Sequence, residues 1–216
     1  MLKWPTILGL LVVLCGPPAM ASLGRRLSDD MVTQLALHLA FCALALFIVF
    51  LVVRFEHLPL TSIGLRTPDW STLVTAVCLF VAGILMQVLV IGPLVERWGD
   101  GRPAAEIAAL ATLPAWYRVV LGATGGIVEE TLYRGYAVER LATLTGRRWL
   151  GAALATLVFA AAHIPSWGVR FAFLADLPAG ILLVAFYLWR RDLVANMLAH
   201  STGIILAMFT VVPRSA

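Results

Sequence analysis

The amino-acid sequence predicts an all-α membrane protein, a polytopic transmembrane bundle of about seven helices. Three observations carry this prediction: 61% of the 216 residues are hydrophobic, only 13% are charged, and the mean hydropathy is +0.93. A soluble domain would have about a quarter of its residues charged. The length leaves no room for a sizeable soluble domain beside the bundle.

The helices are predicted from apolar stretches, because a membrane span takes about 20 mostly apolar residues. The stretches cover residues 4–21, 31–53, 71–95, 116–144, 149–163, 171–189 and 193–212. Proline, glycine and charged residues mark the loops between them, the longest of which are expected at residues 54–69 and 96–114. Pro165 is expected to end the fifth helix just after His163.

The first stretch has two interpretations. Lys3, a short apolar run and the sequence Ala19-Met20-Ala21 fit a cleaved secretory signal. They also fit a membrane helix that is retained, which is the interpretation we favour.

The charged residues and cysteines exclude some classes of function. The net charge of +4 is spread over short loops, as in most membrane proteins, and no basic run predicts binding to nucleic acid. Cys15, Cys42 and Cys78 each lie alone in an apolar stretch, so neither a disulfide nor a zinc–thiolate site is expected. Basic residues divide almost evenly between the two membrane sides, and the double arginines at 147–148 and 190–191 favour a cytoplasmic N-terminus.

Two glutamates and an arginine lie inside the segment Gly126–Gly135, which otherwise suits a lipid bilayer: Glu129, Glu130 and Arg134. Burying a charge in a membrane costs several kcal/mol, so such residues are candidates for a functional site. On a helix, Glu130 and Arg134 are i,i+4 neighbours and are expected to pair. Glu129 projects about 100° away and keeps its carboxylate free to act as a base. The alternative is a buried ion pair with Glu129 as a spectator.

Two other apolar stretches each carry a histidine next to a possible partner. Phe159 and His163 lie four residues apart on one face of an alanine-rich helix, which permits close helix packing. Asn196 and His200 have the same spacing in the last stretch. His38, in the second stretch, is interpreted as an ordinary interfacial histidine.

Helix geometry predicts that these residues meet. With a rise of 1.5 Å per residue, Glu129 and His163 each lie about 22 Å from the loop between their helices, and therefore at one depth. His200 lies about 12 Å from Asp192 on the same side of the membrane. One polar cluster inside the bundle is expected.

The two motifs and the last histidine resemble the CPBP family of intramembrane endopeptidases, which includes the type II CAAX prenyl proteases and the bacterial Abi proteins. The residues that carry the resemblance are Glu129-Glu130-x-x-x-Arg134, Phe159-x-x-x-His163 and His200.

The resemblance covers about residues 63–212. It divides the chain into N-terminal transmembrane helices, residues 1–62, and a CPBP-like protease core, residues 63–216. Family members usually carry Asn or Asp four residues after the last histidine, where this chain has Ile204. Asn196 lies four residues before His200 and is expected to orient it.

The resemblance implies that Glu129 activates water, that Glu130 and Arg134 support the helix, and that His163 and His200 bind or polarise the reacting centre. The family has been described both as metalloproteases and as metal-independent glutamic proteases. One glutamate and two histidines could hold zinc, with His163 and His200 as metal ligands. They could equally supply a base and donors to an oxyanion, and we favour this form without a cofactor.

The expected function is an intramembrane endopeptidase in the inner membrane of a bacterium. Its expected partners are membrane lipid and a protein substrate with a membrane-proximal or C-terminal cleavage segment. Two alternatives stay open: a non-enzymatic membrane scaffold or bacteriocin-immunity-type protein that retains the polar cluster, and a transporter or haem-binding protein that uses the two histidines. The chain lacks the internal repeat that transporters usually show.

Overall fold

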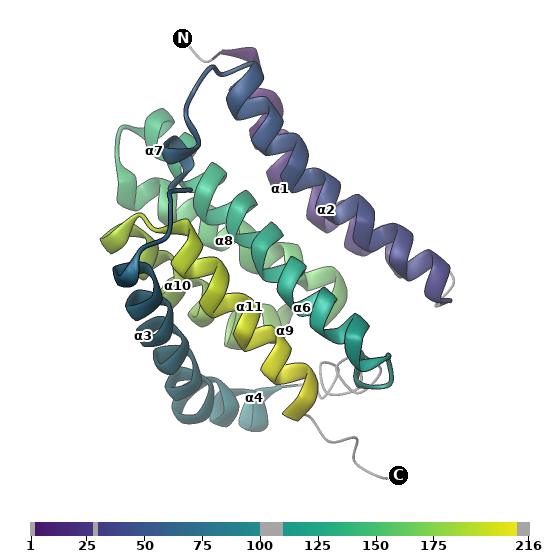
Figure 1. Cartoon of the computed structure of the whole chain (residues 1–216). Helices are drawn as coiled ribbons and strands as arrows, with labels where there is room; N and C mark the ends of the chain where they lie inside the picture. The colour runs from purple at the N-terminus through teal and green to yellow at the C-terminus, as the bar shows by residue number, and fades with distance from the viewer. Residues whose placement is uncertain (1–2, 28–29, 100–109, 211–216) are drawn as a thin grey trace.

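A computed structural model describes residues 3–27, 30–99 and 110–210, and this part of the chain is an all-α bundle (Figure 1). Parts of the predicted loop 96–114 and of the last predicted helix (211–212) lie outside the described residues. Six helical runs in the described part are long and apolar enough to cross a membrane. The prediction of an all-α transmembrane bundle is therefore confirmed.

The helical elements follow one another with short connections. In chain order they are α1 (Trp4–Gly24), α2 (Met31–Arg54), η1 (Leu60–Ile63), α3 (Trp70–Met86), η2 (Gln87–Ile91), α4 (Gly92–Trp98), α6 (Ala115–Glu129), η3 (Glu130–Ala137), α7 (Val138–Thr145), α8 (Arg148–Trp167), α9 (Val169–Phe171), η4 (Ala172–Asp176), α10 (Leu177–Arg190) and α11 (Leu193–Thr210). Of the η segments, η1 is a 3-10 helix and the other three are π-helices.

Helices α1 and α2 form an antiparallel pair along one side of the bundle (Figure 1). Asp30 begins α2 because its carboxylate accepts hydrogen bonds from the backbone amides of Val32 and Thr33, each at 3.0 Å. The pair packs against α6, η3 and α8. It therefore forms one wall of the interior.

The predicted helix 116–144 is present as the continuous run α6–η3–α7, but its middle is a π-helix instead of an α-helix. Such segments occur frequently at functional sites. Two glycines let α6 approach α11 closely. A Cβ atom on Gly126 would lie 2.6 Å from the backbone nitrogen of Ser201, and one on Gly122 would lie 3.0 Å from that of Ile205.

Helix α8 continues to Trp167, so the prediction that Pro165 ends it just after His163 was wrong. Pro165 lies in the last turn, where its missing N–H removes one hydrogen bond without breaking the turns before it. The helix ends at Gly168, whose φ of 84° suits glycine.

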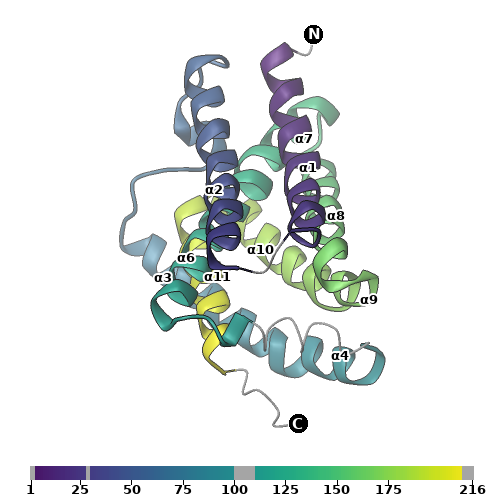
Figure 2. The ribbon, with the colours of Figure 1, turned by 90° about the vertical axis from the view of Figure 1, so that its right-hand side faces the viewer.

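Exposed tryptophans mark both ends of the bundle. The end that carries the starts of α1, α3, α8 and α11 is called the first end, and the opposite end is called the second end (Figure 2). The tryptophans at the first end are Trp4, Trp70, Trp149 and Trp189, and those at the second end are Trp98 and Trp116. Tryptophan is enriched where a membrane meets water, so these belts frame the membrane-spanning part.

Candidate active site

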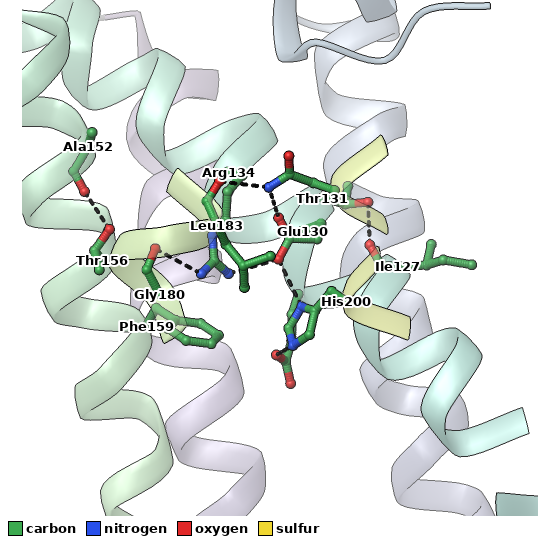
Figure 3. A network of polar contacts seen from close by, with 12 residues as sticks. Ile127, Glu130, Thr131, Arg134, Ala152, Thr156, Phe159, Gly180, Leu183 and His200 are labelled. Carbon is green, nitrogen blue, oxygen red and sulfur yellow. Dashed lines mark hydrogen bonds and ion pairs between the residues drawn. The ribbon is translucent and has the colours of Figure 1, made fainter. Parts of the chain in front are cut away.

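Glu130 lies at the centre of the polar cluster and is fully buried (Figure 3). The ion pair expected from the sequence is present, since Arg134 Nη1 lies 3.0 Å from Glu130 Oε1. The angle of this contact does not make it a hydrogen bond, and the attraction is therefore mainly ionic. His200 Nδ1 lies 2.9 Å from the same oxygen, and Asn196 Nδ2 donates to Oε2 at 3.1 Å.

Asn196, which was expected to orient His200, binds the same carboxylate as His200. Its amide nitrogen also donates to the carbonyl oxygen of Leu183 at 2.8 Å. Asn196 thus reaches His200 only through Glu130. Ile204 lies outside the cluster, with its Cδ1 atom 3.9 Å from the place a Cβ of Gly125 would take.

Phe159 forms a platform under the cluster, which explains the spacing of Phe159 and His163. The guanidinium carbon of Arg134 lies 4.1 Å from the centre of the Phe159 ring. The rings of His163 and His200 meet the Phe159 ring edge-on, with centroid distances of 4.8 and 6.4 Å. One aromatic ring thereby holds the cation and both histidines in place.

Glu129 differs from Glu130 in having no hydrogen bond to any residue that the structure describes. Its nearest polar neighbours are two ring nitrogens: His163 Nε2 lies 3.8 Å from Oε1, and His200 Nε2 lies 3.8 Å from Oε2. Each carboxylate oxygen therefore faces a different histidine across a gap slightly wider than a hydrogen bond.

The partners of the Nδ1 atoms determine where the imidazole hydrogens lie. His163 Nδ1 lies 2.8 Å from the carbonyl oxygen of Phe159, which can only accept, so this nitrogen carries a hydrogen. The same holds for His200 Nδ1 beside the ion-paired carboxylate of Glu130. In neutral histidines both Nε2 lone pairs would point at the Glu129 carboxylate. The two Nε2 atoms and the Glu129 carboxylate would then all be acceptors, so a proton or a water molecule has to lie between them.

A cavity of about 720 Å³ leads from Glu129 and His163 towards the second end. The α1–α2 pair forms much of its wall, with Pro17 and His38 among the lining residues, and Arg25 lies at its far end. Glu129 and His163 are therefore reachable by a ligand, whereas Glu130 is enclosed.

The structure brings together all the site residues that the sequence predicted. They are Glu129, Glu130, Arg134, Phe159, His163, Asn196 and His200. Two further polar residues escaped the prediction. The buried hydroxyl of Tyr133 and the buried Oδ2 of Asp176 have no hydrogen-bond partner in the described part of the chain. Asp176 was detectable as the one charged residue in the apolar stretch 171–189.

Zinc takes ligands of the types that Glu129, His163 and His200 offer. In their present arrangement, the described residues contain no group of three His, Cys, Asp or Glu side chains placed to hold a metal ion.

Residues 111–204 match the family model described as "Type II CAAX prenyl endopeptidase Rce1-like". The match contains every site residue that the sequence predicted, and it confirms the family resemblance. Searches of curated proteins and of solved structures gave no match. With six apolar helices, the protein is an integral multi-pass membrane protein. Over residues 111–204, the chain is therefore similar to the Rce1-like group of type II CAAX prenyl endopeptidases.

Proposed function

We propose that this protein is an intramembrane endopeptidase in which Glu129 activates the water that attacks a peptide bond. One observation carries the proposal: the Glu129 carboxylate lies in a cavity, has no hydrogen bond from a described residue, and faces two histidines at 3.8 Å. A half-buried carboxylate inside a membrane bundle with its oxygens unused is a costly feature for a scaffold to keep. It is suited to accepting a proton.

The surrounding groups suggest how the reaction proceeds. Glu129 takes a proton from water while the oxygen attacks the carbonyl carbon of the substrate. His200, whose Nδ1 hydrogen is held by Glu130, can donate to the oxyanion from Nε2 when that nitrogen carries a proton. When the C–N bond breaks, the leaving nitrogen takes up the proton from Glu129, directly or through His163 Nε2.

Glu130, Arg134, Phe159 and Asn196 have positioning roles in this proposal. Arg134 forms an ion pair with Glu130, and Glu130 holds the His200 ring through its Nδ1 atom. The substrate would be a protein with a membrane-proximal or C-terminal cleavage segment. The short loops suggest the inner membrane of a bacterium as the place of action.

The decisive experiment compares native-host cells that carry the wild-type protein or Glu129→Gln. New protein termini, identified by mass spectrometry of the membranes, should appear only in wild-type cells. With a synthetic peptide spanning the mapped site, the purified variant should cleave about 10²–10⁴ times more slowly. Its thermal stability should stay near wild type, because a neutral amide costs less to bury than a carboxylate.

A wild-type cleavage rate in Glu129→Gln would refute the proposal. Incubation of the wild-type enzyme with a zinc chelator should leave the rate unchanged. A loss that zinc restores would instead establish the metal-dependent form.

A further inference from the structure

We propose that His38 of α2 is a further substrate-binding residue, whose Nδ1 atom accepts a hydrogen bond from a backbone N–H of the bound polypeptide. This inference rests on the proposed function and concerns a residue outside the family-matched region 111–204. From the sequence, His38 was interpreted as an ordinary interfacial residue. The structure instead places it in the wall of the cavity that contains Glu129 and His163.

Hydrogen bonding fixes the orientation of the His38 ring. Its Nε2 atom lies 2.8 Å from Thr124 Oγ1, and that hydroxyl donates its one hydrogen to the carbonyl oxygen of Val120 at 2.6 Å. Nε2 must therefore supply the hydrogen of the His38–Thr124 bond. The ring of Tyr117 packs edge-on against the imidazole, with a centroid distance of 6.0 Å.

The second nitrogen of the ring is left as an acceptor. If Nε2 carries the hydrogen of the neutral imidazole, Nδ1 presents a lone pair. No hydrogen bond joins Nδ1 to another residue in the described ranges 3–27, 30–99 and 110–210. The cavity wall nearby contains the apolar side chains of Leu37, Phe41 and Leu121.

A polypeptide in such a cavity needs acceptors of this kind. Each residue of an extended backbone brings an N–H group, and an unpaired N–H in apolar surroundings costs free energy. Neighbouring strands satisfy this need in a sheet, whereas a single segment inside a helical bundle depends on side chains. A fixed, neutral acceptor on an apolar wall suits a backbone N–H better than a charged group, which would cost more to bury.

The position of His38 also fixes where this contact falls along the substrate. Thr124 lies five residues before Glu129 in α6, which is about 7.5 Å along the helix. An extended chain advances about 3.3 Å per residue. The bound N–H therefore lies about two residues from the scissile bond, in the part of the substrate that runs towards the second end.

Two conservative variants separate this role from a purely structural one. In His38→Asn the side-chain oxygen lies near the position of Nδ1, so the acceptor is retained and the bond to Thr124 is lost. In His38→Gln the amide nitrogen lies near the position of Nε2, so the bond to Thr124 is retained and the acceptor is lost. His57→Gln is the matched control, because His57 is exposed and lies outside the cavity.

The variants are compared in nanodiscs in the Glu129→Gln background, which prevents turnover. The probe is a dye-labelled synthetic peptide spanning the Glu129-dependent cleavage site, and its Kd is measured by fluorescence anisotropy. His38→Gln should raise the Kd about five- to tenfold, the effect of one lost hydrogen bond. His38→Asn and the control should stay within about twofold of the parent. With Glu129 restored, His38→Gln should raise KM and leave kcat nearly unchanged.

Three outcomes would overturn the role of His38 and leave the proposed function intact: His38→Gln binds the peptide like the parent, both variants weaken binding equally, or neither variant folds. In each of these cases the wild-type protein still cleaves the peptide and Glu129→Gln does not. Absence of any Glu129-dependent cleavage would overturn the proposed function first, and the role of His38 with it.

Discussion

Glu56 and Glu129 are both carboxylates inside this bundle, and their surroundings differ in one respect. Glu56, at the first end, accepts hydrogen bonds from Thr6 Oγ1 at 2.8 Å, from Tyr136 Oη at 2.9 Å, and from Arg140 at 2.9 and 2.6 Å. Glu129, in the cavity, has no partner closer than two histidine nitrogens at 3.8 Å.

The difference separates a structural carboxylate from one that is available for chemistry. Glu56 joins α1, α2, η3 and α7 through bonds that use both of its oxygens. It therefore holds the α1–α2 pair against the run η3–α7. Glu129 makes no comparable bonds to the described residues, and this difference is the reason for proposing a chemical role for it. Glu130 combines both features, because it is fully bonded and also touches His200.

The largest effect on folding is expected for Arg134→Ala. The change leaves Glu130 buried without its cation, which typically costs about 3–5 kcal/mol. The amount of folded protein in the membrane and the Tm should fall strongly. In the double variant Arg134→Leu/Glu130→Leu the folded amount should partly recover while cleavage stays absent, because His200 has lost its carboxylate. A normal Tm for Arg134→Ala would refute the structural importance of this pair.

Arg140→Ala tests the structural carboxylate of the comparison, Glu56. The variant removes two charge-assisted bonds from Glu56, which keeps its bonds from Thr6 and Tyr136, and we expect a loss of about 2–3 kcal/mol. The kcat of the remaining folded protein should be unchanged. Arg148→Ala is the matched control, since Arg148 is exposed and lies 3.6 Å from Glu139, and such pairs contribute about 0–1 kcal/mol. If Arg140→Ala lowered kcat at constant Tm, the distinction between the two regions would fail.

The same comparison shows what the sequence could predict. The polar cluster around Glu130 was predictable because charged and polar residues inside apolar stretches have few structural explanations, and because each motif lies within one helix. The Glu56–Arg140 cluster was not, since its partners lie 84 positions apart, with Glu56 in a predicted loop and Arg140 near the end of the predicted helix 116–144, where charged side chains often reach solvent. The number and course of the helices followed from hydropathy, whereas the π-helix at Glu130 has no signal in composition.

His38 and Asp176 illustrate a further limit. A single polar residue in an apolar helix can face lipid, another helix or a cavity, and hydropathy does not distinguish these environments. For His38 the answer depends on Thr124, a residue 86 positions away. Only the packing of α2 against α6 brings the two together.

The smallest effect is expected at Asp192, a bonded carboxylate like Glu56 but placed outside the membrane-spanning helices. Arg66 Nη2 and Thr72 Oγ1 each donate to it at 2.7 Å, and its other oxygen accepts from the Ala195 amide at 3.1 Å. Burial alone would raise the pKa of Asp192. The bonds from Arg66, Thr72 and Ala195 outweigh this effect and hold the pKa below its usual range.

A folded-state pKa below the unfolded value of about 3.9 means that Asp192 stabilises the protein above that pH. The stabilisation is lost as the pH falls through the folded-state pKa. The Tm of the wild-type protein should therefore decrease from about pH 5 downwards. Asp192→Asn should lower the Tm at pH 7 by the equivalent of about 1 kcal/mol and reduce this acid sensitivity, because the amide does not titrate. An equally steep decrease in Asp192→Asn would assign the acid sensitivity to other carboxylates, and would show that a fully bonded carboxylate at the membrane surface contributes less than one inside the bundle.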